Sequence, residues 1–365
     1  MKLFNRDKEI NQIIHILEGE PNFIYFIYGP INSGKTTLIK HIIDNKLNNN
    51  YKVFYINFRT YLISEKKDFI EALFNTKKDG LLETIKDKSE VLNLLTKTTK
   101  TLTGVPIPEI EFNKLFEQKI NDAFQYLNSV LIETKNNGKT PIFILDELQM
   151  IKEITTNGQK YLLKELFQFL VSITKEQHLA HCLCLTSDSL FAEYVYNTGE
   201  LEGRAKYLLI DDFNKQTSLN FIDFLNNELS TNKLLTNEDK ERIYNLVGGK
   251  PYDIYNVIDN LRYDNLDNIL DRLLNDEYQK LTMKLDIIDY VNPTVVIENN
   301  IIPIKKEDII NCLKLFKNSY EISKNKVSTP VYTYLIKHNI LFLNPQNGIL
   351  KPQSYLIWNS IKKII

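Results

Sequence analysis

The eight residues from Gly29 to Thr36 have the types and spacing of a phosphate-binding loop. They read Gly29-Pro30-Ile31-Asn32-Ser33-Gly34-Lys35-Thr36, a full Walker A match, and Thr37 follows. In this motif the glycines let the backbone approach the phosphates and point its N–H groups inward, while Lys35 reaches the β- and γ-phosphates and the Thr36 hydroxyl ligates magnesium. A helix starting at Gly34 would add the positive end of its dipole. We therefore expect residues 29–37 to bind ATP or ADP together with Mg²⁺.

The flanking sequence has the pattern that the motif requires. An apolar run, Phe23 to Tyr28, leads into Gly29, and after Thr37 the apolar residues Leu38, Ile39, Ile42 and Ile43 recur at helical spacing. This pattern predicts a strand, a glycine loop and a helix, the context in which a Walker A match is credible. A chance glycine turn would lack it.

A second chemical motif follows the apolar run Pro141 to Leu145, which ends in Asp146 and Glu147. A buried strand of this kind delivers acidic residues to the carboxyl edge of a parallel sheet. We expect Asp146 to hold Mg²⁺, usually through water, and Glu147 to polarise the attacking water as a general base. An isolated Asp-Glu pair could be a solvated loop, but its pairing with a complete Walker A motif favours the catalytic interpretation. Such a base also distinguishes this chain from P-loop kinases, which transfer phosphate to a bound acceptor.

Two further segments carry weaker signals. Thr186 and Ser187 end the apolar strand pattern Leu183 to Thr186, and would face the γ-phosphate as sensors if that strand lies between the Walker A and Walker B strands; the alternative is an ordinary polar strand end. Arg204 lies between a predicted helix (190–196) and the fifth strand pattern, where AAA-type ATPases carry an arginine finger that stabilises charge on the γ-phosphate. The alternative for Arg204 is a surface arginine beside Glu202.

The strand patterns predict an α/β fold that positions these residues. Short apolar runs at 23–28, 53–58, 142–145, 183–186 and 207–210 alternate with helical patterns, which favours a parallel sheet covered on both faces. Between the second and third runs, residues 69–95 and 112–133 have helical patterns, interrupted by Gly104 to Pro108. The predicted ATPase core therefore covers residues 1–212, with a long helical insertion at about 61–135.

The rest of the chain predicts two smaller domains. Helical patterns at 213–229, 237–246, 252–260 and 266–284 indicate a helical lid over 213–286. The segment Gly248-Gly249-Lys250-Pro251 separates two of these helices, and is either an ordinary helix break or a turn that brings Lys250 near phosphate and Pro251 near adenine. Helical patterns at 306–316 and 331–338, then a hairpin pattern over 340–351, predict a winged helix within 287–365.

Taken in order, five segments resemble the archaeal-type ATPase family of P-loop ATPases, which belongs to the AAA+/STAND assemblage of the ASCE class. The segments are Phe4 to Glu9, Gly29 to Thr36, Leu145 to Gln149, Gly203 to Ala205 and Gly249 to Pro251, and the predicted winged helix follows them. The resemblance covers nearly the whole chain. It implies a sheet of order 5-1-4-3-2, a helical lid, and a nucleotide-controlled switch that is closed with ADP and open with ATP. It also implies that Arg6 and Glu9 lie near the adenine, and that Pro251 lies in a nucleotide-contacting turn.

Composition and charge limit the remaining possibilities. The chain has 365 residues and a formal net charge of -1, so no overall electrostatic field draws it to nucleic acid or to an anionic membrane. No stretch has the apolar length of a membrane helix and no signal-peptide pattern opens the chain, so we expect a cytoplasmic protein. The three cysteines, Cys182, Cys184 and Cys312, lie in apolar segments and are interpreted as small buried hydrophobic residues.

Three functional hypotheses stay open at this stage. The first is a slow Mg²⁺-dependent ATPase that works as a switch. The second is an ATP-regulated DNA-binding protein, because residues 290–365 contain ten lysines and four acidic residues, a net charge of +6, although no arginine. The third is a signalling or defence scaffold that forms homo-oligomers with ATP and docks a protein partner through the winged helix.

Overall fold

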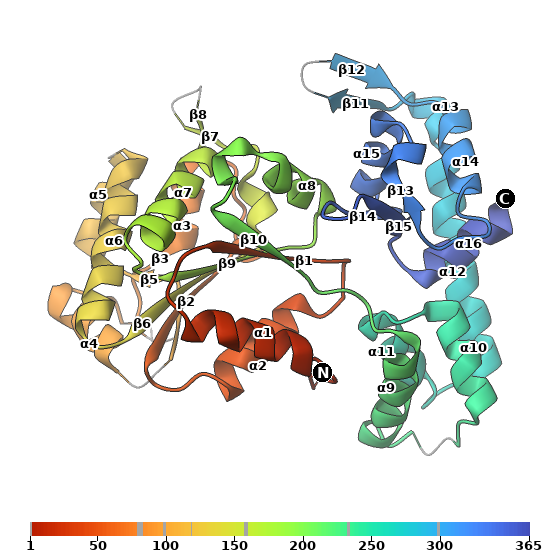
Figure 1. Cartoon of the computed structure of the whole chain (residues 1–365), viewed down its shortest axis with the longest axis horizontal. Helices are drawn as coiled ribbons and strands as arrows, with labels where there is room; N and C mark the ends of the chain where they lie inside the picture. The colour runs from red at the N-terminus through yellow and green to blue at the C-terminus, as the bar shows by residue number, and fades with distance from the viewer. Residues whose placement is uncertain are drawn as a thin grey trace. The chain divides into compact units, whose positions relative to one another are not determined.

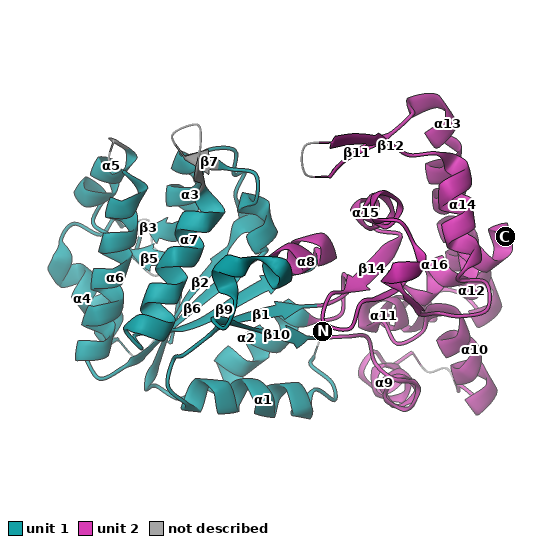
Figure 2. Cartoon of the chain, turned by 45° about the horizontal axis from the view of Figure 1, so that its top comes forward, with its two compact units in different colours: residues 1–28, 35–187, 195–209 teal, residues 29–34, 188–194, 210–365 magenta. Residues whose placement is uncertain are grey.

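The computed structural model of the chain describes residues 2–78, 83–97, 100–117, 119–156, 160–231, 234–297 and 300–365. The chain divides into two compact units, drawn in different colours in Figure 2. The first unit comprises residues 1–28, 35–187 and 195–209. The second comprises residues 29–34, 188–194 and 210–365. Each unit is described by itself.

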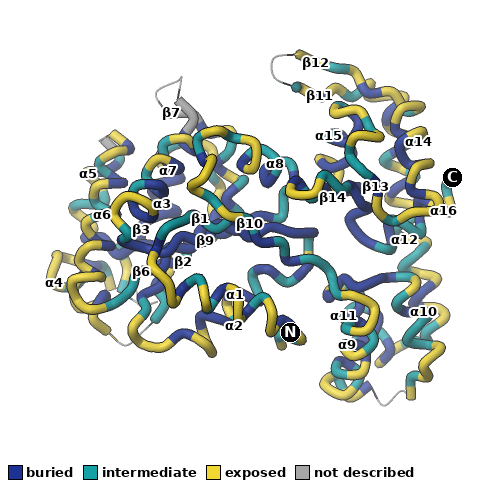
Figure 3. Tube along the Cα trace, in the orientation of Figure 1, coloured by how far each residue is buried: buried dark blue, intermediate teal, exposed yellow. Residues whose placement is uncertain are grey.

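The first unit is built on a parallel sheet. Its strands follow the order β10-β1-β9-β6-β2-β4, with bounds β10 (Ala205–Leu209), β1 (Ile24–Tyr28), β9 (His181–Thr186), β6 (Thr140–Asp146), β2 (Tyr51–Asn57) and β4 (Thr101–Thr103). The five predicted strands thus adopt the order 5-1-4-3-2 that the resemblance implies, and the short strand β4 is added at one edge. Strands β1, β2, β6 and β9 are mostly buried, as the dark blue tubes of Figure 3 show, because helices cover both faces of the sheet, whereas β10 at one edge is largely intermediate in exposure.

Amphipathic helices cover this sheet. In the view of Figure 1, α1 (Asp7–Glu18) and α2 (Lys35–Asn45) lie below the strands, and α7 (Leu162–Val171) lies above them. The apolar residues of α7 recur every three or four positions and are buried, and the helix continues as a π-helix over Ser172–Glu176. The helix α8 (Ser189–Asn197) agrees with the predicted span 190–196 and is shared between the two units.

The insertion differs from the prediction of two continuous helices. The first predicted helix is divided into α3 (Lys66–Leu73) and α4 (Lys88–Thr96), and the second into α5 (Glu109–Glu117) and α6 (Ile120–Asn136). The prediction missed two helix starts. The Asp87 side chain caps α4 by accepting hydrogen bonds from the Ser89 and Glu90 N–H groups. At the start of α6, the Lys119 N–H donates to the Asp122 carboxylate. The small sheets β3 (Phe74–Asn75) with β5 (Val105–Pro106), and β7 (Thr155–Thr156) with β8 (Lys160–Tyr161), complete this unit.

The second unit begins with the predicted lid helices. Their bounds are α9 (Lys215–Glu228), α10 (Asn237–Val247), α11 (Pro251–Asn260) and α12 (Leu266–Asp286). Side chains of Asn214, Thr236 and Asn265 cap α9, α10 and α12, which explains why these helices begin where they do. Pro251 is the first residue of α11, where its missing N–H costs nothing.

The C-terminal part of this unit has a core of its own. Its elements are α13 (Ile288–Val291), β11 (Thr294–Ile297), β12 (Asn300–Pro303), α14 (Lys306–Lys314), β13 (Ile322–Ser323), α15 (Thr329–Lys337), β14 (Leu341–Asn344), β15 (Ile349–Pro352) and α16 (Tyr355–Ile364). The helices and the antiparallel sheet β13-β15-β14 share a buried cluster that also includes Leu281 and Leu285 of α12. The two predicted helices and the hairpin are present, whereas the hairpin β11–β12 was not predicted.

Two expectations drawn from composition can be compared with the described residues. Nowhere in these residues is there a helix with both the length and the apolar character needed to cross a membrane. The three cysteines are buried and form no disulfide, and the sulfur atoms of Cys182 and Cys184 lie 3.9 Å apart on one face of β9. They therefore pack as small hydrophobic residues.

Candidate nucleotide-binding site

The phosphate loop connects β1 to α2, and its two glycines serve different physical purposes. A Cβ at Gly29 would lie 2.1 Å from the carbonyl oxygen of Ile210, so this position requires glycine for close backbone approach. Gly34 has a φ of +94°, a conformation that disfavours any side chain. Between them Asn32 is left-handed, and the Ser33 N–H donates to the Pro30 carbonyl at 3.2 Å. The helix α2 then begins at Lys35 and carries Thr36 and Thr37 in its first turn.

Beside α2, three strands bring polar groups together at one edge of the sheet. Asn57 of β2 is in register with Asp146 of β6, and Asp146 is in register with Leu185 of β9, so the carboxyl ends of these strands are level. One oxygen of Asp146, Oδ2, accepts hydrogen bonds from the Thr36 hydroxyl at 3.1 Å and the Tyr55 hydroxyl at 2.5 Å. Burial, followed by the hydrogen bond to Asp146, raises the pKa of Tyr55, which keeps its hydroxyl protonated as a donor.

The residues at this edge fit a magnesium ion. The Thr36 hydroxyl and the Asp146 carboxylate are hard oxygen donors, and both are next to the start of α2. Among the described residues no group of three or more histidines, cysteines and acidic residues gathers to hold a metal. Mg²⁺ does not need such a group, because it typically binds one or two protein oxygens and completes its octahedron with water and phosphate.

Glu147 follows Asp146 in an unusual backbone conformation. Its φ is +60°, in the left-handed region, which is uncommon for a residue with a side chain and costs about 1–2 kcal/mol. The side chain is 12 % exposed, and its Oε2 accepts a bond from Arg59 Nη2 at 2.8 Å and another from Gln149 Nε2 at 2.6 Å. The carboxylate is therefore held by two donors on one oxygen.

Thr186, a predicted sensor, is connected to the same network. The sheet places β9 between β1 and β6, which is the condition on which the sensor assignment of Thr186 and Ser187 depended. The Thr186 hydroxyl donates to Gln149 Oε1 at 2.8 Å, and the amide of Gln149 donates in turn to Glu147. Thr186 is thus linked to Glu147 through one intervening side chain, that of Gln149, while Ser187 follows the end of β9.

Arg204 lies at the amino-terminal ends of the parallel strands, opposite the carboxyl ends where Asp146 lies. It immediately precedes β10, which runs parallel to β1 from Ala205 to Leu209, and its backbone carbonyl accepts a bond from the Ile24 N–H at the start of β1. The five residues of β10 span roughly 16 Å, so Arg204 is that far from the edge that carries Asp146. Its exposed guanidinium donates to the Glu200 carbonyl at 3.2 Å. Arg204 and Asp146 therefore do not meet within one molecule, and the arginine-finger role of Arg204 stays a prediction.

The residues expected near the adenine lie in different units. Arg6 is buried at the N-terminus of α1, and its Nη1 is paired with Glu9 Oε1 at 2.9 Å. Pro251 is buried at the start of α11 in the second unit. Next to it, Lys250 Nζ donates to the Ile31 carbonyl of the phosphate loop at 2.8 Å and pairs with Asp212 at 3.4 Å. The adenine contacts of Arg6 and Pro251 remain predictions.

Sequence reasoning missed several side chains of this site. Tyr55 gave no signal, because a tyrosine inside a strand is common. Arg59 stands out as one of six arginines in the chain, but this scarcity assigned it no role. Gln149 belongs to the segment that carried the family resemblance, but no role followed from its type. Near the loop, Asp211 and Gln353 have partners that are distant in the sequence, and no pattern in one sequence reveals such pairings.

Comparison with known proteins gives the family. Residues 3–257 match a family described as an ATPase domain predominantly from Archaea, and residues 267–365 match the C-terminal domain of proteins similar to the uncharacterized ATP-binding protein MJ1010. The chain therefore belongs to this archaeal ATPase-domain family, as the resemblance predicted. Its P-loop fold is also shared by the Walker-type ATPase PABY2304 of Pyrococcus abyssi, with 16% identity, a TM-score of 0.65, and coverage of 99% of this chain and 96% of that one.

Two relatives from Methanocaldococcus jannaschii are similar over the full length. The uncharacterized ATP-binding protein MJ0147 is 68% identical over 365 residues, covering 100% of this chain and 98% of the relative. The uncharacterized ATP-binding protein MJ0801 is 63% identical over 381 residues and is covered completely. The similarity thus includes both the ATPase domain and the C-terminal domain.

Proposed function

We propose that this chain binds ATP with Mg²⁺ through its phosphate loop and hydrolyses it slowly, as a nucleotide-controlled switch. The observation that carries the proposal is the cluster at the carboxyl edge of the sheet. There, Thr36 and Tyr55 donate to one oxygen of Asp146, and Glu147 lies one residue further on. Relatives described as ATP-binding proteins give independent support.

Each residue has a physical role in this proposal. Lys35 neutralises phosphate charge, and Thr36 with Asp146 would hold Mg²⁺, which when bound offsets the charge that develops on the phosphate oxygens. Glu147 would accept the proton of the attacking water. Thr186, through Gln149, would link the state of the γ-phosphate to the position of Glu147. Lys250 and Pro251 would contact the nucleotide from the lid.

Slow turnover follows from the contacts of Glu147. A general base must have a free oxygen within hydrogen-bond distance of the water it activates. Both Arg59 and Gln149 donate to Glu147 Oε2 and hold the carboxylate in its present orientation, so at least one of these bonds must be exchanged if the carboxylate is to turn toward the attacking water. Such an exchange adds to the barrier, which suits a switch better than a fast motor.

If Arg204 is an arginine finger, its position requires ATP-dependent self-association. Since the start of β10 is at the far edge of the sheet, the guanidinium would act in a neighbouring copy. The protein should therefore have a larger hydrodynamic size with a non-hydrolysable ATP analogue than with ADP. Equal sizes with the two nucleotides would remove this part of the proposal.

The DNA-binding alternative rests on the lysines of the C-terminal domain, which we interpret as a winged helix from its order α14, α15, hairpin. Several of these lysines have acidic partners: Lys306 pairs with Asp286 and Asp289, and Lys324 and Lys351 pair with Glu193 and Asp211. Because these pairs reduce the charge available to a phosphate backbone, we do not adopt DNA as the partner. Retention on duplex DNA that weakens across a salt series would reverse this choice.

Two variants test the enzymatic proposal. Glu147→Gln should bind ATP but not release phosphate, because an amide cannot accept the proton. Lys35→Ala should lose ATP binding. Phosphate release by Glu147→Gln at the wild-type rate would show that Glu147 is not the base, and full binding by Lys35→Ala would show that the loop does not hold the nucleotide.

A further inference from the structure

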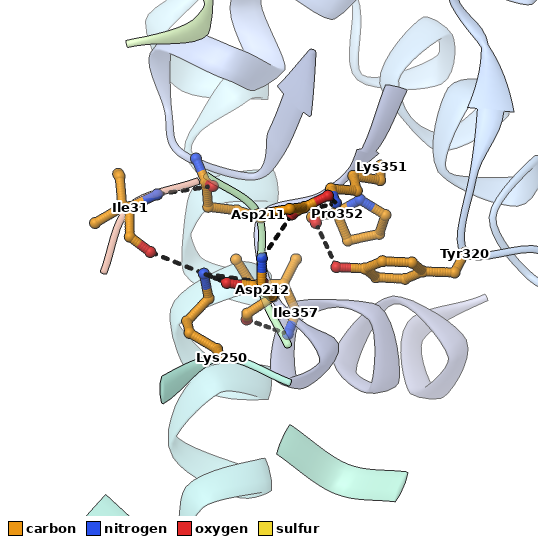
Figure 4. A network of polar contacts seen from close by, with 10 residues as sticks. Ile31, Asp211, Asp212, Lys250, Tyr320, Lys351, Pro352 and Ile357 are labelled. Carbon is orange, nitrogen blue, oxygen red and sulfur yellow. Dashed lines mark hydrogen bonds and ion pairs between the residues drawn. The ribbon is translucent and has the colours of Figure 1, made fainter. Parts of the chain in front are cut away.

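The backbone N–H and the backbone carbonyl of Ile31, in the phosphate loop, are each hydrogen-bonded to a side chain from a later part of the chain. The Ile31 N–H donates to Gln353 Oε1 at 3.3 Å, and the Ile31 carbonyl accepts from Lys250 Nζ at 2.8 Å. Figure 4 shows Lys250 reaching the Ile31 carbonyl. Gln353 follows β15 of the C-terminal domain, and Lys250 precedes α11 of the lid. The tip of the loop is therefore joined to both.

An ionic anchor holds the Gln353 segment in place. Lys351 Nζ donates to both carboxylate oxygens of Asp211 at 2.7 Å, and the lysine is almost completely buried. The neighbouring Asp212 accepts from Lys250, and the Tyr320 hydroxyl donates to the Pro352 carbonyl at 3.1 Å. Figure 4 shows these contacts around Lys351 and Pro352, and the next residue along the chain, Gln353, is 7 % exposed.

The bond between Gln353 and the loop is of a kind that phosphate can replace. The Ile31 N–H can only donate, so the atom facing it must be the amide oxygen, a neutral acceptor. At 3.3 Å this bond is longer than the usual 2.9–3.0 Å of an N–H···O bond. A phosphate oxygen carries charge, and charge-assisted bonds are roughly twice as strong as neutral ones. Anions in such loops are bound through backbone N–H groups.

We propose that Gln353 is a specificity-determining residue of the phosphate loop, whose side-chain oxygen occupies the Ile31 N–H until the γ-phosphate takes its place. ATP then competes with Gln353, while ADP, which lacks the third phosphate, leaves the bond intact. The C-terminal domain thereby responds to which nucleotide is bound. This inference rests on the proposed ATP binding and names the contact through which the switch operates.

The direct test compares nucleotide affinities by calorimetry, with Mg²⁺ and either ADP or a non-hydrolysable ATP analogue. Gln353→Met removes the acceptor at nearly constant size, so the affinity for the ATP analogue should rise by about 2- to 12-fold, the factor that one net hydrogen bond represents, while the ADP affinity stays the same. Gln353→Glu keeps the acceptor and adds a negative charge, so it should lower the affinity for the ATP analogue relative to ADP. Opposite changes from two substitutions at one position are not expected of a merely structural residue.

A matched control and a reciprocal measurement complete the test. Gln346→Met makes the same change at an exposed turn residue of the same hairpin and should leave both affinities unchanged. By linkage, the ATP analogue should also speed amide hydrogen exchange over residues 351–357 relative to ADP. Asp211→Asn, which weakens the anchor without changing Gln353 itself, should raise the affinity for the ATP analogue in the same direction as Gln353→Met.

The outcomes separate this inference from the proposal on which it rests. If the wild-type protein binds neither nucleotide, the proposed function fails. If it binds both but Gln353→Met leaves the ratio of affinities unchanged, or weakens both equally as the loss of a brace would, the inference alone is overturned. Equal hydrogen exchange with ADP and with the ATP analogue would also overturn it.

Discussion

The ion pair between Arg59 and Glu147 leads to a quantitative prediction about turnover. If Glu147 must exchange the Arg59 guanidinium for a water molecule before it acts as a base, the free energy of this pair is part of the activation barrier. Arg59 is 65 % exposed, so its pair with Glu147 is largely screened and is worth about 0.2–1 kcal/mol rather than the larger value of a buried pair. Arg59→Met keeps the side-chain length and removes the charge. It should therefore raise kcat by about 1.4- to 5-fold.

The assay is steady-state phosphate release at saturating ATP, measured over a salt series. Screening weakens the pair in the wild-type protein, so its kcat should approach that of Arg59→Met as ionic strength rises from about 0.05 to 0.5 M. Arg242→Met is the matched control, because Arg242 is an exposed arginine that also pairs with an acid, Asp267, and lies outside the site. A fall in kcat on Arg59→Met would refute the reasoning and show that the guanidinium assists the reaction.

Three further predictions concern the metal site, the lid turn and pH. Tyr55→Phe removes a donor to Asp146 and should raise the Mg²⁺ concentration needed for half-maximal turnover by about 10-fold. The control Tyr51→Phe, in the same strand but bonded to the Leu17 carbonyl, should leave this concentration unchanged. Equal Mg²⁺ requirements for the two variants would contradict the role of Tyr55. Gly249→Ala would place a Cβ 1.7 Å from the Phe213 carbonyl oxygen and should cost about 1–3 kcal/mol in denaturant unfolding, whereas Gly199→Ala, with nothing within 4 Å, should change stability by less than about 0.5 kcal/mol. Burial raises the pKa of Asp253 from 3.8 to about 7, so its protonated form stabilises the fold below pH 4 and this contribution is lost as pH rises toward 7. Asp253→Asn should therefore flatten the fall in Tm between about pH 4 and pH 7, and an unchanged slope would assign that fall to other groups.

The sequence alone was sufficient to predict the strands of the central sheet and the motifs at their carboxyl ends. Apolar runs that end in Gly29, Asp146 and Thr186 predict strand ends by position alone, and the carboxyl ends of parallel strands share one edge. Their order followed from the family resemblance, because periodicity in one chain does not reveal which strands are neighbours. The lid helices were predicted closely, since each has strong capping residues such as Asn214 and Thr236.

The remaining features depend on contacts that are distant in the sequence. The Tyr55 hydroxyl meets Asp146 across 91 positions, and Gln353 meets Ile31 across 322, so only the fold brings these pairs together. The insertion was predicted less well, because continuous apolar spacing obscured the helix breaks before Asp87 and at Lys119. One close backbone approach was also missed. Gly29 lies against the Ile210 carbonyl, a contact between distant positions that the motif does not reveal, and its approach to phosphate stays a prediction.

The most direct test of the central claim is a single-turnover experiment on Glu147→Gln beside the wild-type protein. With excess protein, Mg²⁺ and radiolabelled ATP, bound nucleotide and released phosphate are measured in the same samples. The account predicts that both proteins retain ATP at first, that the wild-type protein converts it to ADP, and that Glu147→Gln keeps it intact. Conversion of ATP to ADP by Glu147→Gln at the wild-type rate would contradict the account.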